Sequence, residues 1–209
     1  MKICIFGADG RTGKEVVKIA LDQGHEVVAF VYSKKAKEFL PESVVIKVGD
    51  VMDLNDVKSA MIDADSVISV IGHIKDSDPL MQTKGITNIT QSMKDLKIER
   101  IISLTGTGVR FDGDKPSILD KLANIIIKFI DRERIIDGIK HADVLKESNL
   151  NWTILRVLKL SQQNQSNTKY SLTKNGPAEN MTSRQKVAKI LVDLVNSDDY
   201  IKEAPVVSE

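Results

Sequence analysis

Hydrophobic positions along this chain fall into short continuous runs that alternate with longer segments of helical periodicity. The runs are rich in Val and Ile, which is typical of strands buried on both faces of a sheet. The pattern predicts strands at 2–6, 26–31, 44–48, 66–71, 100–104 and 152–157. It predicts helices at 11–23, 53–62, 79–96, 117–130, 132–148 and 183–196, and residues 169–173 alternate like an edge strand.

The regular alternation of strands and helices predicts one α/β domain over residues 1–209. Strands separated by helices form right-handed βαβ units, so we expect a Rossmann-type, doubly wound, mainly parallel sheet flanked by helices. In such sheets ligands bind outside the carboxyl ends of the strands. We therefore expect the substrate-side elements at about 105–135 and 157–182, including the polar loop 161–168.

The stretch IFGADGRTG at 5–13 places three glycines between the first predicted strand and the first helix. Gly7 would allow a tight turn, Gly10 would let a pyrophosphate approach the backbone, and Gly13 would let the helix pack close to the strand. The helix N-terminus then offers free N–H groups and partial positive charge to phosphates. The nucleotide site predicted at this turn comprises Gly7, Asp9, Gly10, Arg11, Thr12 and Gly13.

The spacing of the first two glycines resembles that of the extended and atypical short-chain dehydrogenase/reductases. Further stretches carry the same resemblance over nearly the whole chain. It is most similar to the NAD(P)H-binding, NmrA-like proteins and the small biliverdin reductase B/flavin reductase group. The stretches are VGDVMD at 48–53, SVIG at 69–72, ERIISLTGTG at 99–108, LKESNLNWTILRV at 145–157 and SRQKVA at 183–188.

The resemblance implies a cofactor lying along the ends of the strands. It implies that Asp50 and Val51 border the adenine and that Ile71 and Gly72 line the ribose, with His73 next in the chain. It places Thr105 beside the nicotinamide.

The residues after the second strand favour NADP(H) over NAD(H). NAD-preferring units carry an acidic residue about 20 positions beyond the glycines. Here Tyr32, Ser33, Lys34 and Lys35 occupy that region, so a hydroxyl and two positive charges would meet a 2′-phosphate. Related proteins often have Arg where Tyr32 stands, and Tyr32 would stack on the adenine without adding charge. The alternative for the two lysines is a solvated loop.

The Tyr-x-x-x-Lys pair of the alcohol-oxidising short-chain dehydrogenases has no match on the helix after the fifth strand, because 132–148 contains no Tyr. Tyr170 has Lys174 four residues on, but both fall in a strand-like segment. Positions i and i+4 are about 13 Å apart on a strand and about 6 Å apart on a helix. We therefore expect this pair to be a false match.

Other polar groups are candidates for the chemistry. Thr105 and Thr107 flank the end of the fifth strand, and His141 follows Asp137 by one helical turn. An exposed helix pair is the leading interpretation of Asp137 and His141, with a carboxylate-oriented imidazole as the alternative. We expect Arg156 to brace the crevice. The loop with Arg110, Asp112 and Asp114 either covers the substrate or is a solvated turn.

The segment 119–130 is unusually apolar for a surface helix. Core packing is the leading interpretation, with a dimer interface or a substrate wall as alternatives. We expect either a monomer or a homodimer.

The composition and charge of the chain limit the kinds of partner that we expect it to bind. Thirty basic against twenty-nine acidic residues give a net charge of +1, so we expect neither nucleic acid nor a membrane as partner. One cysteine, Cys4, excludes disulfides and cysteine-ligated metals, and together with the lack of a leader-like segment favours the cytoplasm.

Two functions remain open. The first is an NADPH-dependent reductase that passes a hydride to a planar acceptor such as a flavin, a tetrapyrrole or a quinone, with solvent supplying the proton. The second is a non-catalytic NADP(H)-binding sensor. A sugar-nucleotide epimerase is disfavoured because the Tyr and a large C-terminal domain are missing.

Overall fold

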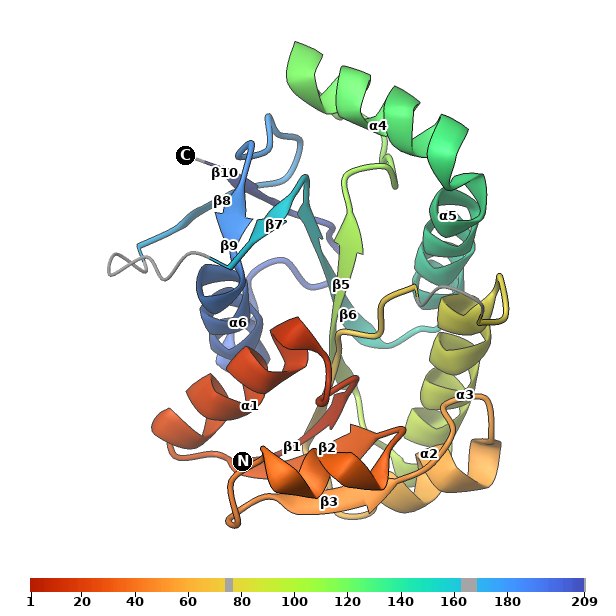
Figure 1. Cartoon of the computed structure of the whole chain (residues 1–209), viewed down its shortest axis with the longest axis vertical. Helices are drawn as coiled ribbons and strands as arrows, with labels where there is room; N and C mark the ends of the chain where they lie inside the picture. Colours follow the sequence, from red (N-terminus) through yellow and green to blue (C-terminus); the bar gives the residue numbers. More distant parts are fainter. Residues whose placement is uncertain (74–76, 163–168, 209) are drawn as a thin grey trace.

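One sheet with helices on both faces organises this computed structural model, which describes residues 1–73, 77–162 and 169–208 (Figure 1). Its strands are β1 (Lys2–Phe6), β2 (Glu26–Val31), β3 (Val45–Val48), β4 (Ser66–Ser69), β5 (Arg100–Gly106), β6 (Asn151–Val157), β8 (Ser171–Thr173) and β10 (Val206–Ser208). Within the described part they form an eight-stranded sheet in the order β3-β2-β1-β4-β5-β6-β10-β8. Neighbouring strands from β3 to β10 are parallel, and β8 is antiparallel to β10. β7 (Leu160–Ser161) and β9 (Thr182–Ser183) form a separate two-stranded ladder.

The helices alternate with the strands, as the sequence predicts. They are α1 (Arg11–Asp22), α2 (Leu54–Ala60), α3 (Met81–Leu96), α4 (Ile118–Ile130), α5 (Arg132–Glu147) and α6 (Arg184–Asp193), with 3₁₀ turns η1 (Lys34–Glu38) and η2 (Leu194–Asn196). Helices α2, α4 and α6 begin at polar caps that satisfy free backbone N–H groups. Asp53 accepts from the second and third N–H groups of α2, and Ser117 and Ser183 accept from the third N–H of α4 and α6.

Alternation along β1 divides the core between the two faces of the sheet. Ile3 and Ile5 pack with α1 and α6 on one face, and Cys4 and Phe6 pack with α2, α3 and α5 on the other. All four side chains are fully buried, as the continuous apolar run predicts. Burial raises the pKa of the Cys4 thiol, which behaves as a small apolar residue.

The fold class is confirmed, and the differences lie at the ends of elements and in the short elements η1, β7, β9 and β10, which were not predicted. The predicted strand 66–71 ends at Ser69, and the predicted helix 183–196 divides into α6 and η2. Strand β10 was not predicted, because Val206 and Val207 form too short an apolar run and pair only with distant segments. Of the predicted polar loop, residues 163–168 lie outside the described residues.

Candidate functional site

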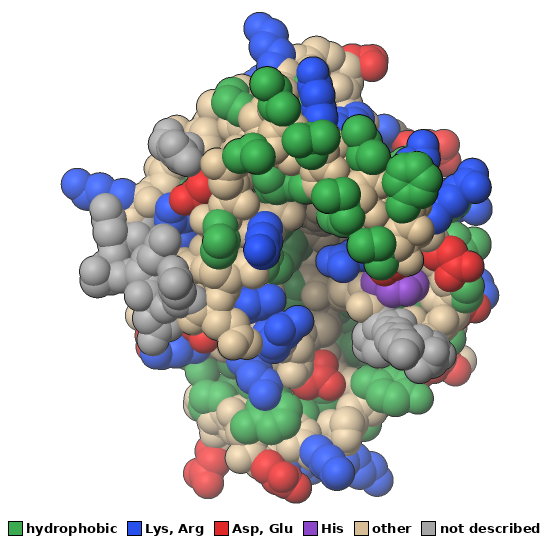
Figure 2. Space-filling view, turned by 45° about the horizontal axis from the view of Figure 1, so that its top comes forward, with side chains coloured by type: hydrophobic (Ala, Val, Ile, Leu, Met, Phe, Trp, Pro, Cys, Tyr) green, Lys and Arg blue, Asp and Glu red, His purple; other side chains and the backbone are tan. Residues whose placement is uncertain are grey.

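The carboxyl ends of neighbouring strands gather the predicted cofactor segments at one edge of the sheet. Strands β3, β2, β1, β4 and β5 are parallel neighbours, so the chain leaves each of them on the same side. The predicted cofactor segments at these strand ends are 7–13, 32–34, 50–51, 71–73 and 105–107. Figure 2 shows a hollow on this face of the molecule with Lys and Arg side chains gathered at it. The structure therefore brings together segments that are far apart in sequence.

The glycine turn between β1 and α1 has the backbone geometry that its sequence requires. Gly7 has a φ of +78°, a conformation that side chains rarely adopt. A Cβ on Gly13 would lie 2.1 Å from the Gly7 carbonyl oxygen, so the helix can begin this close to β1 only with glycine there. The Gly10 N–H donates to the Gly7 carbonyl over 3.0 Å and closes the turn.

The N-terminus of α1 carries no side-chain cap, and two arginines lie near it. Gly10 occupies the N-cap position without a side-chain hydrogen bond. Arg11 is exposed at the first position of α1, and Arg184 begins α6. Burial lowers the pKa of Arg184, and the positive charge of nearby Arg11 lowers it further. Two guanidinium groups beside an uncapped helix N-terminus favour an anion such as a pyrophosphate.

Arg184 was not singled out in the sequence as a cofactor residue. The stretch SRQKVA was the signal that could have found it, since this stretch begins α6, which packs against α1. Thr12 is buried and Asp9 is half-buried in the same turn.

The segment after β2 offers exposed polar groups at the same edge of the sheet. Tyr32 is 75% exposed and Lys34 is exposed. The Ser33 hydroxyl oxygen accepts the Lys35 N–H over 3.3 Å and begins the turn η1. The hydroxyl proton of Ser33 and the ammonium of Lys34 are donors to a ligand at this position.

The segment after β3 is held by its own hydrogen bonds. The Asp50 carboxylate accepts the Met52 N–H over 2.9 Å, and the Asp50 N–H donates to the Asp56 carboxylate over 3.0 Å. The Val51 carbonyl accepts the Asn88 amide over 3.0 Å, which ties this turn to α3.

The segment after β4 is open to a ligand. A Cβ on Gly72 would meet no atom within 4 Å, so space is free beside this backbone. Ile71 and His73 are half-buried, and the buried Nδ1 of His73 has no hydrogen-bond partner within the described residues.

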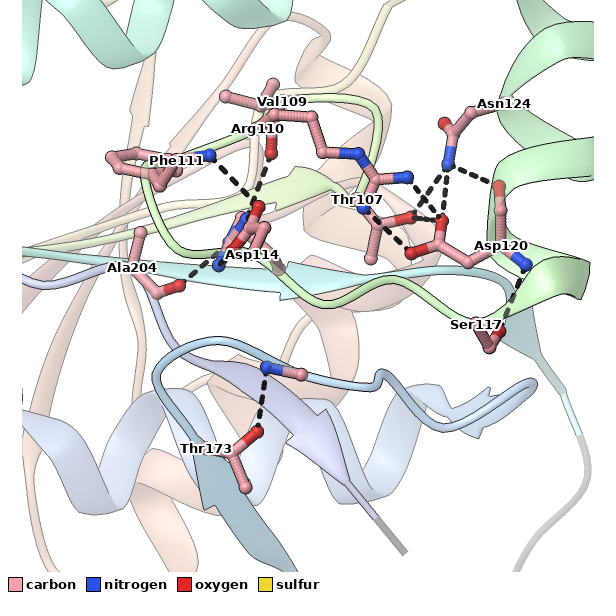
Figure 3. Close-up of polar contacts among 12 residues, drawn as sticks. Thr107, Val109, Arg110, Phe111, Asp114, Ser117, Asp120, Asn124, Thr173 and Ala204 are labelled. Atoms are coloured by element: carbon pink, nitrogen blue, oxygen red, sulfur yellow. Dashed lines mark hydrogen bonds and ion pairs between the residues drawn. The ribbon is translucent and has the colours of Figure 1, made fainter.

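Thr105 and Thr107 lie at the end of β5, and Thr107 belongs to a polar cluster (Figure 3). The Thr107 hydroxyl donates to the Asp120 carboxylate over 2.7 Å and accepts from Asn124 over 3.1 Å. Arg110 donates to both oxygens of Asp120, over 2.8 and 3.1 Å. The Thr107 hydroxyl therefore anchors α4 to the end of β5. Thr105 is 9% exposed and lies one strand position before Gly106.

The interpretation of Asp137 and His141 as an exposed helix pair is wrong. Both are buried, with His141 3% exposed. Asp137 accepts the backbone N–H groups of Gln82 and Thr83 over 3.0 and 2.9 Å, so its carboxylate caps the start of α3. Its burial could not be read from α5 alone, because the partner lies in a distant helix.

The His141 ring is bonded inside the protein. Its Nε2 lies 2.8 Å from the Ser103 hydroxyl, and its Nδ1 has no partner within the described residues. Burial lowers the pKa of His141 to about 4, and the Asp137 charge opposes this shift only in part. The ring is therefore neutral at pH 7, and its Nε2 either donates a hydrogen bond to the Ser103 hydroxyl or accepts one from it, depending on the tautomer.

Arg156 joins four segments around the end of β6. Its guanidinium bonds the Asp114 carboxylate over 2.5 and 2.9 Å and reaches the carbonyls of Val109, Lys174 and Ala204. Burial raises the pKa of Asp114, but the bonds from Arg156 and the Phe111 N–H outweigh burial and hold that pKa below its usual value. The loop before α4 is therefore not simply a solvated turn.

Tyr170 and Lys174 turn to different partners. The Tyr170 hydroxyl donates to Asp193 over 2.7 Å, and the Lys174 ammonium lies 2.7 Å from Glu203. Burial and the Asp193 carboxylate raise the pKa of Tyr170, which is the opposite of what an adjacent lysine does.

Core packing of 119–130 is wrong, because most of the apolar side chains of α4 face solvent. Phe129 is 88% exposed and Ile130 is 80% exposed.

Among the described helices, none is long and apolar enough to cross a membrane. The described residues contain no group of three or more His, Cys, Asp or Glu able to hold a metal ion.

Comparison with known proteins agrees with this geometry. A family model described as NAD(P)H-binding matches residues 7–198. The uncharacterized protein YwnB of Bacillus subtilis is 34% identical over 113 residues, which cover 53% of this chain and half the length of YwnB.

Two solved structures share the fold over almost their full length. The anaerobillin reductase ChuY of Escherichia coli O157:H7 has a TM-score of 0.81 at 20% identity, covering 99% of this chain and 97% of that one. A Streptococcus pneumoniae protein, SP1627, that carries the name NADH-flavin reductase has a TM-score of 0.80 at 23% identity, covering 100% and 99%.

Proposed function

This chain belongs to the NAD(P)H-binding family, and we propose that it is an NADPH-dependent reductase whose acceptor is a planar conjugated molecule such as a flavin, a tetrapyrrole or a quinone. Within that family we place it with the NmrA-like proteins, near the biliverdin reductase B/flavin reductase group. The observation that carries the proposal is the glycine turn, which leaves the N-terminus of α1 uncapped at the strand ends, with Arg11 of α1 and Arg184 of α6 near each other.

The residues at the strand ends fit a dinucleotide. The turn would hold the pyrophosphate through the N–H groups at the start of α1, with Arg11 and Arg184 adding positive charge. Space beside Gly72 would admit the ribose. Ser33 and Lys34 would meet a 2′-phosphate, and no acidic side chain stands at 32–35 to repel it. These contacts support NADP(H) over NAD(H).

On the acceptor side, the protein would act mainly by positioning the two reactants and less by general acid–base catalysis. When bound, the reduced nicotinamide would supply a hydride, and the cofactor would thereby become oxidised. A flat acceptor held in contact with it takes that hydride at an electron-poor carbon or nitrogen, and solvent supplies a proton. Thr105 lies at the end of β5, where its hydroxyl would orient the nicotinamide or the acceptor. The reductase names of ChuY and SP1627 support an acceptor of this kind.

His141 and Thr107 would act on this site indirectly. The His141 ring is bonded to Ser103 inside the sheet layer, and the Thr107 hydroxyl holds α4 through Asp120. Both would position the end of β5, and neither is proposed as the proton donor. A reaction that needs no protein acid at the acceptor is consistent with that arrangement.

The internal hydrogen bonds of Thr107 and His141 also favour a second function, a non-catalytic sensor of NADP(H). In a sensor the polar groups beside the nicotinamide would serve only to hold the fold, and Thr107 and His141 already have internal partners. A sensor would bind the oxidised or the reduced cofactor preferentially and would reduce no acceptor.

A panel assay separates the two functions. Purified protein is titrated with NADPH and NADP⁺ by calorimetry, and NADPH oxidation is followed with riboflavin, FMN, menadione and biliverdin. Turnover that a Gly10→Val variant abolishes supports the reductase. Cofactor binding without turnover on any acceptor assigns the sensor. A protein that binds neither NADPH nor NADP⁺ refutes both.

A further inference from the structure

The solvent side of α4 is apolar along its whole length. The side chains that make up this face are all at least 52% exposed, and Figure 2 shows hydrophobic side chains gathered above the hollow, where α4 lies. They include a row spaced by four, three and four residues. The row is Ile118, Leu122, Ile125 and Phe129, and Leu119, Ile126 and Ile130 widen it.

The orientation of α4 is fixed by its opposite side. Asp120 is 1% exposed and is bonded by Thr107 and Arg110, and Asn124 bonds both Thr107 and Asp120 (Figure 3). The Ser117 hydroxyl caps the first turn by accepting the Asp120 N–H over 3.1 Å. The helix is therefore held in place by buried polar contacts, and the apolar row points away from them.

The exposed face is large enough to be an interface. Its seven side chains are 52–88% exposed and together present on the order of 800 Å² that a partner could cover, comparable with the ~800 Å² that each partner buries in a stable complex. The largest apolar patch of a typical monomer is about 300–600 Å². A face of this size costs free energy while it stays in water.

We propose that the apolar face of α4 pairs with the same face of a second copy of this chain about a two-fold axis. Spacings of four, three and four residues form the seam by which two helices pack at a crossing angle of about 20°. A two-fold axis lets one self-complementary face supply both sides of the contact. In the antiparallel arrangement Leu122 of one copy lies beside Ile125 of the other, and the helix dipoles oppose each other.

Two other occupants fit the face less well. A helix lying on a lipid surface exposes a broad charged side to water, whereas the opposite side of α4 is docked on the protein and its lysines, Lys121 and Lys128, share one edge. An acceptor in the hollow would be reached from the side of α4 that carries Asp120 and faces Thr107. The seam points away from that side.

A matched pair of substitutions tests the pairing. Ile125 and Ile62 are 52% and 53% exposed, and Ile62 lies in the turn before β4, away from α4. Light scattering coupled to gel filtration is run from 1 to 100 μM on the full chain. We expect the wild type and Ile62→Lys to have twice the mass of the 23.2 kDa chain. Ile125→Lys, which would bring a charge into the seam of both copies, weakens pairing ~100-fold or more.

Cross-linking tests the geometry of the pair. Cys4 is buried, so an Ile125→Cys variant carries one accessible thiol. With a short thiol-to-thiol cross-linker that bridges the offset between the two Ile125 positions, we expect Ile125→Cys to form a covalent dimer, whereas Ile62→Cys should pair without becoming covalently linked. A monomeric wild type at 100 μM overturns the proposal, as does a dimer that Ile125→Lys leaves intact. Co-flotation of monomeric wild type with phosphatidylserine vesicles also overturns it, and assigns the face to lipid.

Discussion

The carboxylate of Asp114 and the guanidinium of Arg156 form a buried, two-bonded ion pair that ties the loop before α4 to the end of β6. The Arg156 side chain is 1% exposed and the Asp114 side chain 8% exposed, so each charge depends on the other for its solvation. Removal of one partner leaves the other charged and unpaired in the interior.

We predict that Asp114→Ala lowers the free energy of unfolding by about 3–5 kcal/mol, since it strands the Arg156 charge. Asp112→Ala, in the exposed part of the same loop, is the matched control and should change the free energy by about 0.5 kcal/mol or less. Urea denaturation at pH 7 measures both. Equal effects of the two substitutions would show that the ion pair contributes no more than a surface carboxylate does.

Stability should fall as the pH drops from 6.5 towards 4, because of His141. Its pKa in the folded protein is about 4, below the ordinary value of 6.5, so the unfolded chain binds the proton first. The stability it contributes is complete above pH 6.5 and is lost towards pH 4, at about 1.4 kcal/mol per pH unit.

The test of this pH dependence compares urea denaturation at pH 7 and pH 5 for the wild type and His141→Gln. We expect the wild type to lose about 2 kcal/mol more than the variant between these pH values. Lys140→Gln, an exposed neighbour on α5, should behave as the wild type does. The same pH slope in His141→Gln and wild type would assign the loss to other groups.

The glycine turn gives a prediction that separates folding from binding. A Cβ at Gly13 would lie 2.1 Å from the Gly7 carbonyl, while a Cβ at Gly10 would lie 3.1 Å from it. We therefore expect Gly13→Ala to disrupt the packing of α1 and to lower the melting temperature strongly. Gly10→Val should stay folded and lose NADPH affinity ~100-fold or more, because its side chain would occupy the place of the pyrophosphate. If a folded Gly10→Val protein bound NADPH as tightly as the wild type does, the assignment of the cofactor to this turn would be wrong.

The layout of the fold was predictable because its signals are local. Six apolar runs identified the strands from β1 to β6, and three spaced glycines identified the turn after β1. The cap made by Asp137 was not predictable, since its partners Gln82 and Thr83 lie in another helix. Strand β10 depends in the same way on a distant partner, β6.

The candidate site was predictable to a smaller extent. Strand ends located its segments, but side-chain partners decide what each residue is able to do. Thr107 and His141 have hydroxyl and imidazole groups suited to catalysis, but the Thr107 hydroxyl is bonded to Asp120 and the His141 ring to Ser103. The exposed face of α4 was misassigned to the core because sequence hydrophobicity does not say which surface covers a helix.

Cofactor preference should respond to Ser33. A charge-assisted contact to the 2′-phosphate is worth about 1.5–3 kcal/mol, or roughly tenfold to more than a hundredfold in affinity. Ser33→Asp replaces the donor with a like charge, so the ratio of NADPH to NADH affinity should invert. Ser43→Asp, an exposed serine before β3, is the control and should leave the ratio unchanged. Calorimetric titration with NADPH and NADH measures this ratio. An unchanged ratio in Ser33→Asp would show that the 2′-phosphate is recognised by other residues.

Tyr170 should be dispensable for any reduction that the acceptor panel reveals. Its hydroxyl is bonded to Asp193, its pKa is raised by burial and by that carboxylate, and Lys174 is paired with Glu203. A tyrosine in this state is a poor proton donor at pH 7. We expect Tyr170→Phe to keep turnover within about threefold of the wild type, equivalent to less than ~0.7 kcal/mol of barrier. Thr105→Val, at the end of β5, should lower turnover about tenfold or more. Steady-state kinetics with saturating NADPH measure both variants, and a hundredfold loss in Tyr170→Phe alone would restore a tyrosine-based mechanism.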